Sequence, residues 1–182
     1  MEFGGFEKCT LIDYPGKIAC MVYTIGCNFR CPYCHNPELV DETVTHTFQE
    51  KDILSFLDGR KKMLDGVVIT GGEPTIHGDN LISFIKEVKA RGFLVKLDSN
   101  GTNPEFLERV IQEKLVDYIA MDIKSPKAKY SQIVSRPVDM DAIEKSIQLL
   151  MKGNVDYEFR TTLLKVLLSP EDIEDIGREI KG

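Results

Sequence analysis

The chain has 182 residues, 42% of them hydrophobic and 29% charged, with 23 basic and 29 acidic residues. This size and composition predict a single folded domain over residues 1–182, and the acidic balance, without Lys/Arg clusters among aromatics, argues against nucleic-acid binding. The sequence has no secretion-signal pattern and no apolar stretch of membrane length, so we expect a cytoplasmic protein without a membrane partner.

Strands and helices are predicted to alternate along the chain. The turn sequence Asp13-Tyr14-Pro15-Gly16 leads into the first of several short apolar runs, which are typical of strands buried in a parallel sheet. The predicted strands cover residues 18–24, 67–70, 93–97, 118–123 and 157–163.

Between these strands, apolar residues recur at helical spacing. The capping-box pattern Thr47-Phe48-Gln49-Glu50 predicts a helix that runs to Leu64. Further helices are expected over 81–88, 104–111 and 143–151, and Ser169-Pro170-Glu171-Asp172 predicts the start of a fifth.

This alternation predicts βα units joined by right-handed crossovers into a parallel sheet. Five units are too few to close an eight-stranded barrel, so we expect an α/β fold that is a curved, partial β/α barrel. Ligands of such sheets bind beyond the carboxyl ends of the strands. The polar motifs described below all follow predicted strands, so we expect them to meet at one edge.

Three of the five cysteines, Cys27, Cys31 and Cys34, form a Cys-x3-Cys-x2-Cys array just after the first strand. This clustering favours a metal site in a reducing compartment over a disulfide framework. Three thiolates suit a four-iron cluster with one open iron. The alternative is a structural zinc site completed by His35. Cys9 and Cys20 lie outside the array, and Cys20 is predicted to be a small buried apolar residue.

Gly71-Gly72-Glu73-Pro74 follows the second strand. Taken alone it is an ordinary turn, but two glycines also let a ligand approach the backbone closely because they carry no Cβ. The motif is therefore a candidate ligand-binding turn.

A second set of candidates follows the later strands. Asp98, Ser99 and Asn100 could accept hydrogen bonds from ribose hydroxyls or hold a small cation together with Asp122. The alternative is an Asx-type turn that leads into an Asn103 helix cap. The remaining candidates are Tyr33, an aromatic within the cysteine array, and two cations that could meet a carboxylate, Lys124 and Arg160.

The cysteine spacing and the Gly-Gly-Glu-Pro turn resemble the radical S-adenosylmethionine (SAM) superfamily. The resemblance implies a [4Fe-4S] cluster on Cys27, Cys31 and Cys34, with SAM on the open iron. One electron from the cluster would then cleave SAM to methionine and a deoxyadenosyl radical that abstracts hydrogen. It also implies that residues 71–74 receive the SAM ammonium group and that Tyr33 sets backbone groups against adenine.

Further motifs resemble the activating enzymes of glycyl-radical enzymes, above all the anaerobic ribonucleoside-triphosphate reductase activating type. These motifs are Asp13-Tyr14-Pro15-Gly16, Cys34-His35-Asn36-Pro37, Leu97-Asp98-Ser99-Asn100-Gly101, Met121-Asp122-Ile123-Lys124 and Phe159-Arg160-Thr161-Thr162. Ser99 replaces the usual threonine. The resemblance implies a large glycyl-radical enzyme as partner and an electron donor such as flavodoxin or ferredoxin. The alternatives are a radical SAM enzyme for a small molecule and a zinc-stabilised binding module.

Two further expectations follow. Because the fifth strand would have no parallel neighbour beyond it, we expect a domain that lacks its C-terminal unit and is open on that side. We also expect Gly72→Val to block SAM binding while the cluster survives.

Overall fold

Five parallel strands form the centre of the fold, as the sequence predicts. The structure, a computed structural model, describes residues 1–181 and contains a seven-stranded sheet of order β3-β1-β2-β4-β5-β6-β7. Neighbours from β2 onward pair in parallel, which gives the expected partial β/α barrel. The parallel strands are β2 (Ala19–Thr24), β4 (Gly66–Gly71), β5 (Leu94–Ser99), β6 (Tyr118–Asp122) and β7 (Asp156–Arg160).

Two antiparallel strands at the start of the sheet are not predicted by the sequence. β1 (Glu2–Thr10) pairs with β2, and the two-residue β3 (Phe48–Gln49) pairs with β1. The predicted helix from Thr47 to Leu64 is too long at both ends, because β3 takes its first residues and Gly59 caps the observed helix, α2 (Glu50–Asp58). Phe48 lies opposite Phe3 in the ladder, and this tertiary pairing overrides the local capping pattern.

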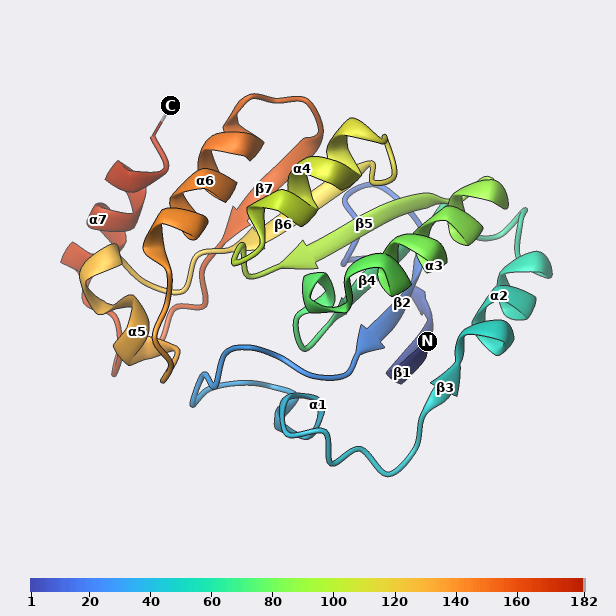
Figure 1. Ribbon diagram of the computed structural model, residues 1–182, viewed down its shortest axis with the longest axis horizontal. Coiled ribbons are helices and arrows are strands. Elements are labelled where there is room, and N and C mark those ends of the chain that lie inside the picture. The colour runs from blue at the N-terminus through green and yellow to red at the C-terminus, as the bar shows by residue number, and fades with distance from the viewer. Residues whose placement is uncertain (182) are drawn as a thin grey trace.

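Helices cover one face of the sheet. α3 (Gly78–Ala90), α4 (Pro104–Gln112) and α6 (Met140–Met151) pack against it in Figure 1 and bury the main core, in which Phe84, Leu107 and Leu150 are fully buried. α7 (Pro170–Glu179) begins where the sequence predicts the fifth helix, at a capping box formed by Ser169 and Asp172. The short elements are α1 (Pro37–Val40), η1 (Pro74–His77), η2 (Lys127–Lys129) and α5 (Tyr130–Ile133). None of the helices in residues 1–181 has the length and hydrophobicity that a membrane-spanning segment needs.

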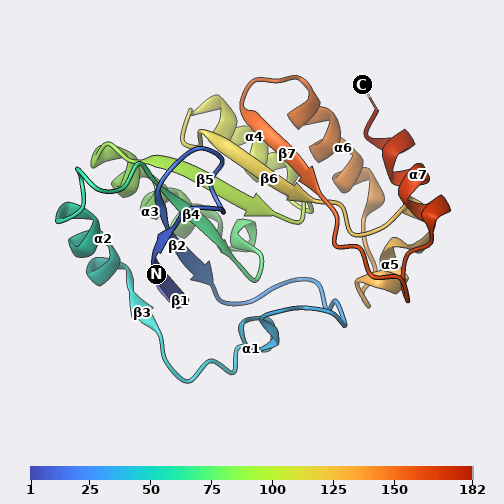
Figure 2. The same cartoon turned by 180° about the vertical axis from the view of Figure 1, so that it is seen from behind.

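The opposite face of the sheet is concave and faces the interior of the partial barrel (Figure 2). A second, smaller apolar cluster lies on this side and contains Tyr14, Ala19, Met21 and Val68. Side chains alternate between the two faces of a strand, so on β5 Val95 and Leu97 point into the main core while Lys96 and Asp98 point to the opposite face.

Two strand ends differ from the prediction. β5 is longer and includes Asp98 and Ser99, which pair with Ala120 and Met121 on β6. β7 ends at Arg160, and Leu163, which was expected within that strand, is 64% exposed. Within the described residues β7 is the last strand of the sheet.

Candidate active site

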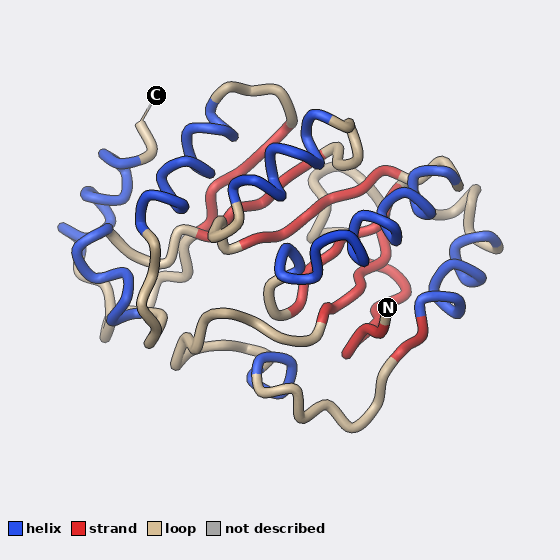
Figure 3. Tube along the Cα trace, in the orientation of Figure 1, coloured by secondary structure: helices blue, strands red, loops and turns tan. Residues whose placement is uncertain are grey.

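One cavity of about 190 Å³ lies at the carboxyl edge of the parallel strands, where the connecting loops gather in Figure 3. All the candidate residues predicted from the sequence line it. They are Cys27, Cys31, Tyr33, Cys34, Gly71, Gly72, Glu73, Pro74, Asp98, Ser99, Asn100, Asp122, Lys124 and Arg160. His35, considered from the sequence as the fourth ligand of a zinc site, also lines it, and sequence reasoning missed four further lining residues, which are Phe29, Val40, Thr70 and Thr162.

The cysteine loop, residues 25–36, brings three thiols to this cavity. None of the chain's five cysteines forms a disulfide, and Cys20 is fully buried in β2 as predicted. Within residues 1–181, no three His, Cys, Asp or Glu side chains are grouped around one point as for a single metal ion. A four-iron cluster places each thiolate on a different iron, so its ligands surround a cavity and do not converge on one atom.

The protonation of Cys27 and Cys31 depends on burial. Burial raises the pKa of Cys27 to about 11 and also raises the pKa of Cys31, so both are neutral thiols in the metal-free protein. The positive charge of Lys124 lowers the pKa of both thiols, but burial raises it by more. Three unpaired thiols beside a cation fit a cluster site whose loading releases protons.

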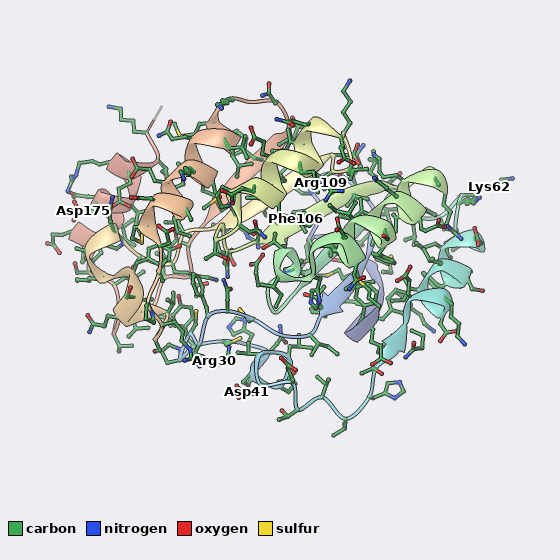
Figure 4. The ribbon with its side chains drawn as sticks, viewed as in Figure 1. Arg30, Asp41, Lys62, Phe106, Arg109 and Asp175 are labelled. Carbon is green, nitrogen blue, oxygen red and sulfur yellow. The ribbon has the colours of Figure 1, made fainter. Side chains whose placement is uncertain are left out.

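Two contacts fix the cysteine loop from the side of β6. The ring of Phe29 meets the fully buried ring of Tyr130 edge-on, with centroids 6.2 Å apart. The Arg30 backbone N–H donates to the Val134 carbonyl oxygen at 2.9 Å. Arg30 also pairs with Asp41 at 3.6 Å, and Figure 4 shows both at the outer edge of the molecule. The segment around α5 therefore supports the loop.

On the side of β5, the loop is fixed by side-chain amides. Asn100 Nδ2 donates to Asn28 Oδ1 at 2.7 Å, and Asn28 Nδ2 donates to Thr102 Oγ1 at 2.8 Å. Asn100 Oδ1 accepts from the Thr102 backbone N–H two residues on, which is the Asx turn considered from the sequence. Asn103 then caps α4 by accepting from Phe106 N, as that alternative predicts. Asn100 thus both forms this turn and lines the cavity.

The Gly71-Gly72 turn packs directly on the cysteine loop. Gly72 N donates to Thr24 O at 3.0 Å, and Glu73 N donates to Gly26 O at 2.9 Å. A Cβ on Gly72 would lie 1.9 Å from Gly26 O. The sequence predicts that a side chain here spares the cluster, but the structure contradicts this because the side chain would displace the loop that carries Cys27.

Glu73 is completely buried, and its carboxylate joins the ends of β4 and β5. Oε1 accepts from Ser99 Oγ at 2.9 Å and from both N and Oγ1 of Thr75, while Oε2 accepts from Asn100 N at 2.6 Å. Burial raises the pKa of Glu73, and these four donors oppose the rise. The side chain is thus occupied by protein donors, so Glu73 positions the site through its carboxylate.

Charged side chains of β5, β6 and β7 and of Lys124 just after β6 form a chain of alternating sign. Lys96 Nζ lies 2.9 Å from Asp98 Oδ1, and Arg160 bridges Asp98 Oδ2 at 3.2 Å and Asp122 Oδ1 at 3.1 Å. Lys124 Nζ lies 2.8 Å from Asp122 Oδ2. The two carboxylates suggested from the sequence as cation ligands are therefore already bridged by a guanidinium.

Lys96 is missing from the sequence-based candidates, although it is only 1% exposed. A charged residue within a buried apolar strand is a signal that could have identified it, because buried lysines need an anionic partner. Its position two residues before Asp98 places both side chains on the same face of β5.

The charge chain sets the protonation of its members. Burial alone would raise the pKa of Asp122, but Lys124 and Arg160 outweigh it and lower that pKa. Burial lowers the pKa of Lys124 and of Arg160. The neighbouring carboxylates raise it by more, so the pKa of each is above its ordinary value. All three side chains are therefore ionised at neutral pH.

Asp122→Asn is expected to destabilise the protein at pH 7 by about 2 kcal/mol, because it removes charged hydrogen bonds to two cations. The folded state lowers the pKa of Asp122 below its ordinary 3.8, so the contribution is present above that value and is lost as the pH falls through the folded pKa. Urea unfolding at pH 7 and pH 3 measures the difference between wild type and variant. A difference that grows on acidification would contradict this assignment.

The Radical SAM superfamily model matches residues 21–181, which contain every element of this cavity. The chain belongs to the radical SAM superfamily. This radical SAM domain is similar to a Methanocaldococcus jannaschii protein provisionally named a glycyl-radical enzyme activating enzyme, with 39% identity over 97% of the chain and 74% of the relative. It is also 34% identical to the pyruvate formate-lyase-activating enzyme of Listeria monocytogenes, over 65% of the chain.

The matched part spans about half (51%) of that Listeria protein. Among solved structures, a radical SAM methyltransferase from Sphaerobacter thermophilus has a TM-score of 0.71 at 15% identity, covering 96% of this chain and 55% of the other. At that identity the likeness concerns the fold alone, and it agrees with the partial barrel described above.

Proposed function

We propose that the chain is a glycyl-radical enzyme activating enzyme that uses SAM and a [4Fe-4S] cluster held by Cys27, Cys31 and Cys34. The observation that carries the proposal is the single cavity shared by these thiols and the polar residues at the strand ends. When bound, the cluster would supply one electron for the cleavage of SAM. Overall, SAM, that electron and a glycine C–H bond of the partner would yield methionine, 5′-deoxyadenosine and a glycyl radical.

The residues of the chain would divide the binding of SAM among them. The Gly71-Gly72 backbone, which lines the cavity, would receive the ammonium group. Lys124 is the terminal cation of the charge chain and directs one of its three donors to Asp122. Its remaining donors are available to the SAM carboxylate. Asp98 and Ser99 would face the ribose, and Tyr33 would lie beside the adenine.

Tyr33 and Phe29 also limit the access of water. Burial raises the pKa of Tyr33 to about 12, so its hydroxyl stays neutral across the physiological range. Phe29 is 3% exposed and closes the inner side of the loop. A site with few mobile waters protects a reactive species from side reactions.

For the partner we propose the anaerobic ribonucleoside-triphosphate reductase. Support comes from the motifs around Asp13-Tyr14-Pro15-Gly16 and Met121-Asp122-Ile123-Lys124, which are similar to those of that activating type. The electron donor would be a flavodoxin or ferredoxin.

Anaerobic electron paramagnetic resonance tests both parts of the proposal. The reconstituted chain, SAM and a chemical reductant are incubated with the reductase or, in parallel, with pyruvate formate-lyase. A glycyl-radical signal with the reductase and none with the lyase is the expected result. A signal with the lyase alone would overturn the choice of partner, and SAM cleavage that needs a small molecule in place of either protein would overturn the activating function.

A further inference from the structure

A closed ring of three side-chain hydrogen bonds joins the cysteine loop to the end of β5. Asn28 Nδ2 donates to Thr102 Oγ1 at 2.8 Å, Thr102 Oγ1 donates to Asn100 Oδ1 at 2.7 Å, and Asn100 Nδ2 donates to Asn28 Oδ1 at 2.7 Å. Each of the three groups gives one hydrogen bond and receives one within the ring. The orientation of each side chain therefore depends on the other two.

The ring connects the two halves of the candidate site. Asn28 directly follows Cys27, and Asn100 directly follows Ser99 at the end of β5. These residues are 72 positions apart in the chain, so the ring is a tertiary link and not a local turn. Thr102 does not line the cavity, and its hydroxyl reaches the site only through the two amides.

We propose that Thr102 is a positioning residue: its hydroxyl holds Asn28, and through it the cysteine loop, at a set position relative to the end of β5. The inference rests on the proposed function, because that function requires the cluster and SAM to lie at a fixed separation. Without the hydroxyl, Asn28 Nδ2 has no acceptor in the ring, while Asn100 keeps its turn through the Thr102 backbone N–H. The loss therefore acts on the cysteine loop more than on β5.

The test compares Thr102→Val, which removes the hydroxyl and keeps the shape, with Thr102→Ser, which keeps the hydroxyl. In metal-free protein, the hydrogen-bonded backbone amides of Phe29 and Arg30 should exchange hydrogen about fivefold faster in Thr102→Val, the effect of losing one ordinary hydrogen bond. In reconstituted protein, Thr102→Val should bind SAM about fivefold more weakly at unchanged iron content. Thr102→Ser should match wild type in both measurements.

Unchanged exchange or unchanged SAM affinity in Thr102→Val would overturn the proposal, as would a Thr102→Ser protein that behaves like Thr102→Val. Asn28→Ala provides a second variant at an exposed loop position, where folding is not at risk, and it should reproduce the faster exchange. Wild-type protein that loads iron and binds no SAM would overturn the proposed function. The hydrogen-exchange comparison would then still test whether the Thr102 hydroxyl holds the cysteine loop.

Discussion

Cys31→Ala is expected to abolish cluster binding, with bound iron falling to background after anaerobic reconstitution. Cys31 lies between the other two thiols in the sequence and lines the same cavity. Two remaining thiolates would leave two cluster irons without a protein ligand, and thiolate ligands supply most of the binding free energy of such a site. Cys27→Ala and Cys34→Ala should give the same result. Iron and sulfide analysis, with the visible absorption of the cluster, measures the loss.

The two cysteines outside the loop provide controls. Cys9 is exposed, so Cys9→Ala should keep full iron content and wild-type stability. Cys20 is fully buried in β2, so Cys20→Ala should keep iron but lose about 1 kcal/mol of unfolding free energy through the small cavity that it creates. Full iron loading in Cys31→Ala, or its loss in Cys9→Ala, would refute the ligand assignment.

Gly72→Ala is expected to destabilise the protein by about 3 kcal/mol and to impair both iron loading and SAM binding. The new Cβ would lie 1.9 Å from Gly26 O and 2.6 Å from Gly26 C. These are backbone atoms, so the conflict can be relieved only if the cysteine loop moves away from the end of β4. That movement would also break the hydrogen bond from Glu73 N to Gly26 O.

Gly177→Ala is the matched control, because a Cβ at that position in α7 would meet no atom within 4 Å. It should stabilise the protein by about 0.5–1 kcal/mol through its better helix propensity. Chemical unfolding of the metal-free proteins measures both changes in stability. Iron analysis after reconstitution measures whether the cysteine loop still binds the cluster. A Gly72→Ala protein with wild-type stability and full iron would show that Gly72 does not pack against the Gly26 backbone.

The sequence by itself determined which residues gather at the site. Cys27, Gly71, Asp98 and Asp122 each lie at or just beyond the end of a strand, and their strands are recognisable from short apolar runs. Because parallel strands place their carboxyl ends at one edge, local patterns were enough to predict that these residues meet. The Asx turn at Asn100 was likewise visible as a local alternative, since it involves neighbours in the chain.

Only the tertiary structure decided how those residues are held. Arg160 bridges Asp98 to Asp122, and Thr102 orients Asn28, yet neither of these long-range partnerships leaves a local pattern. The pairing of β3 with β1 moved the start of α2 for the same reason. Hydrogen bonds and ion pairs between distant residues depend on distances of a few tenths of an ångström, and those distances are set by how the packed sheet curves.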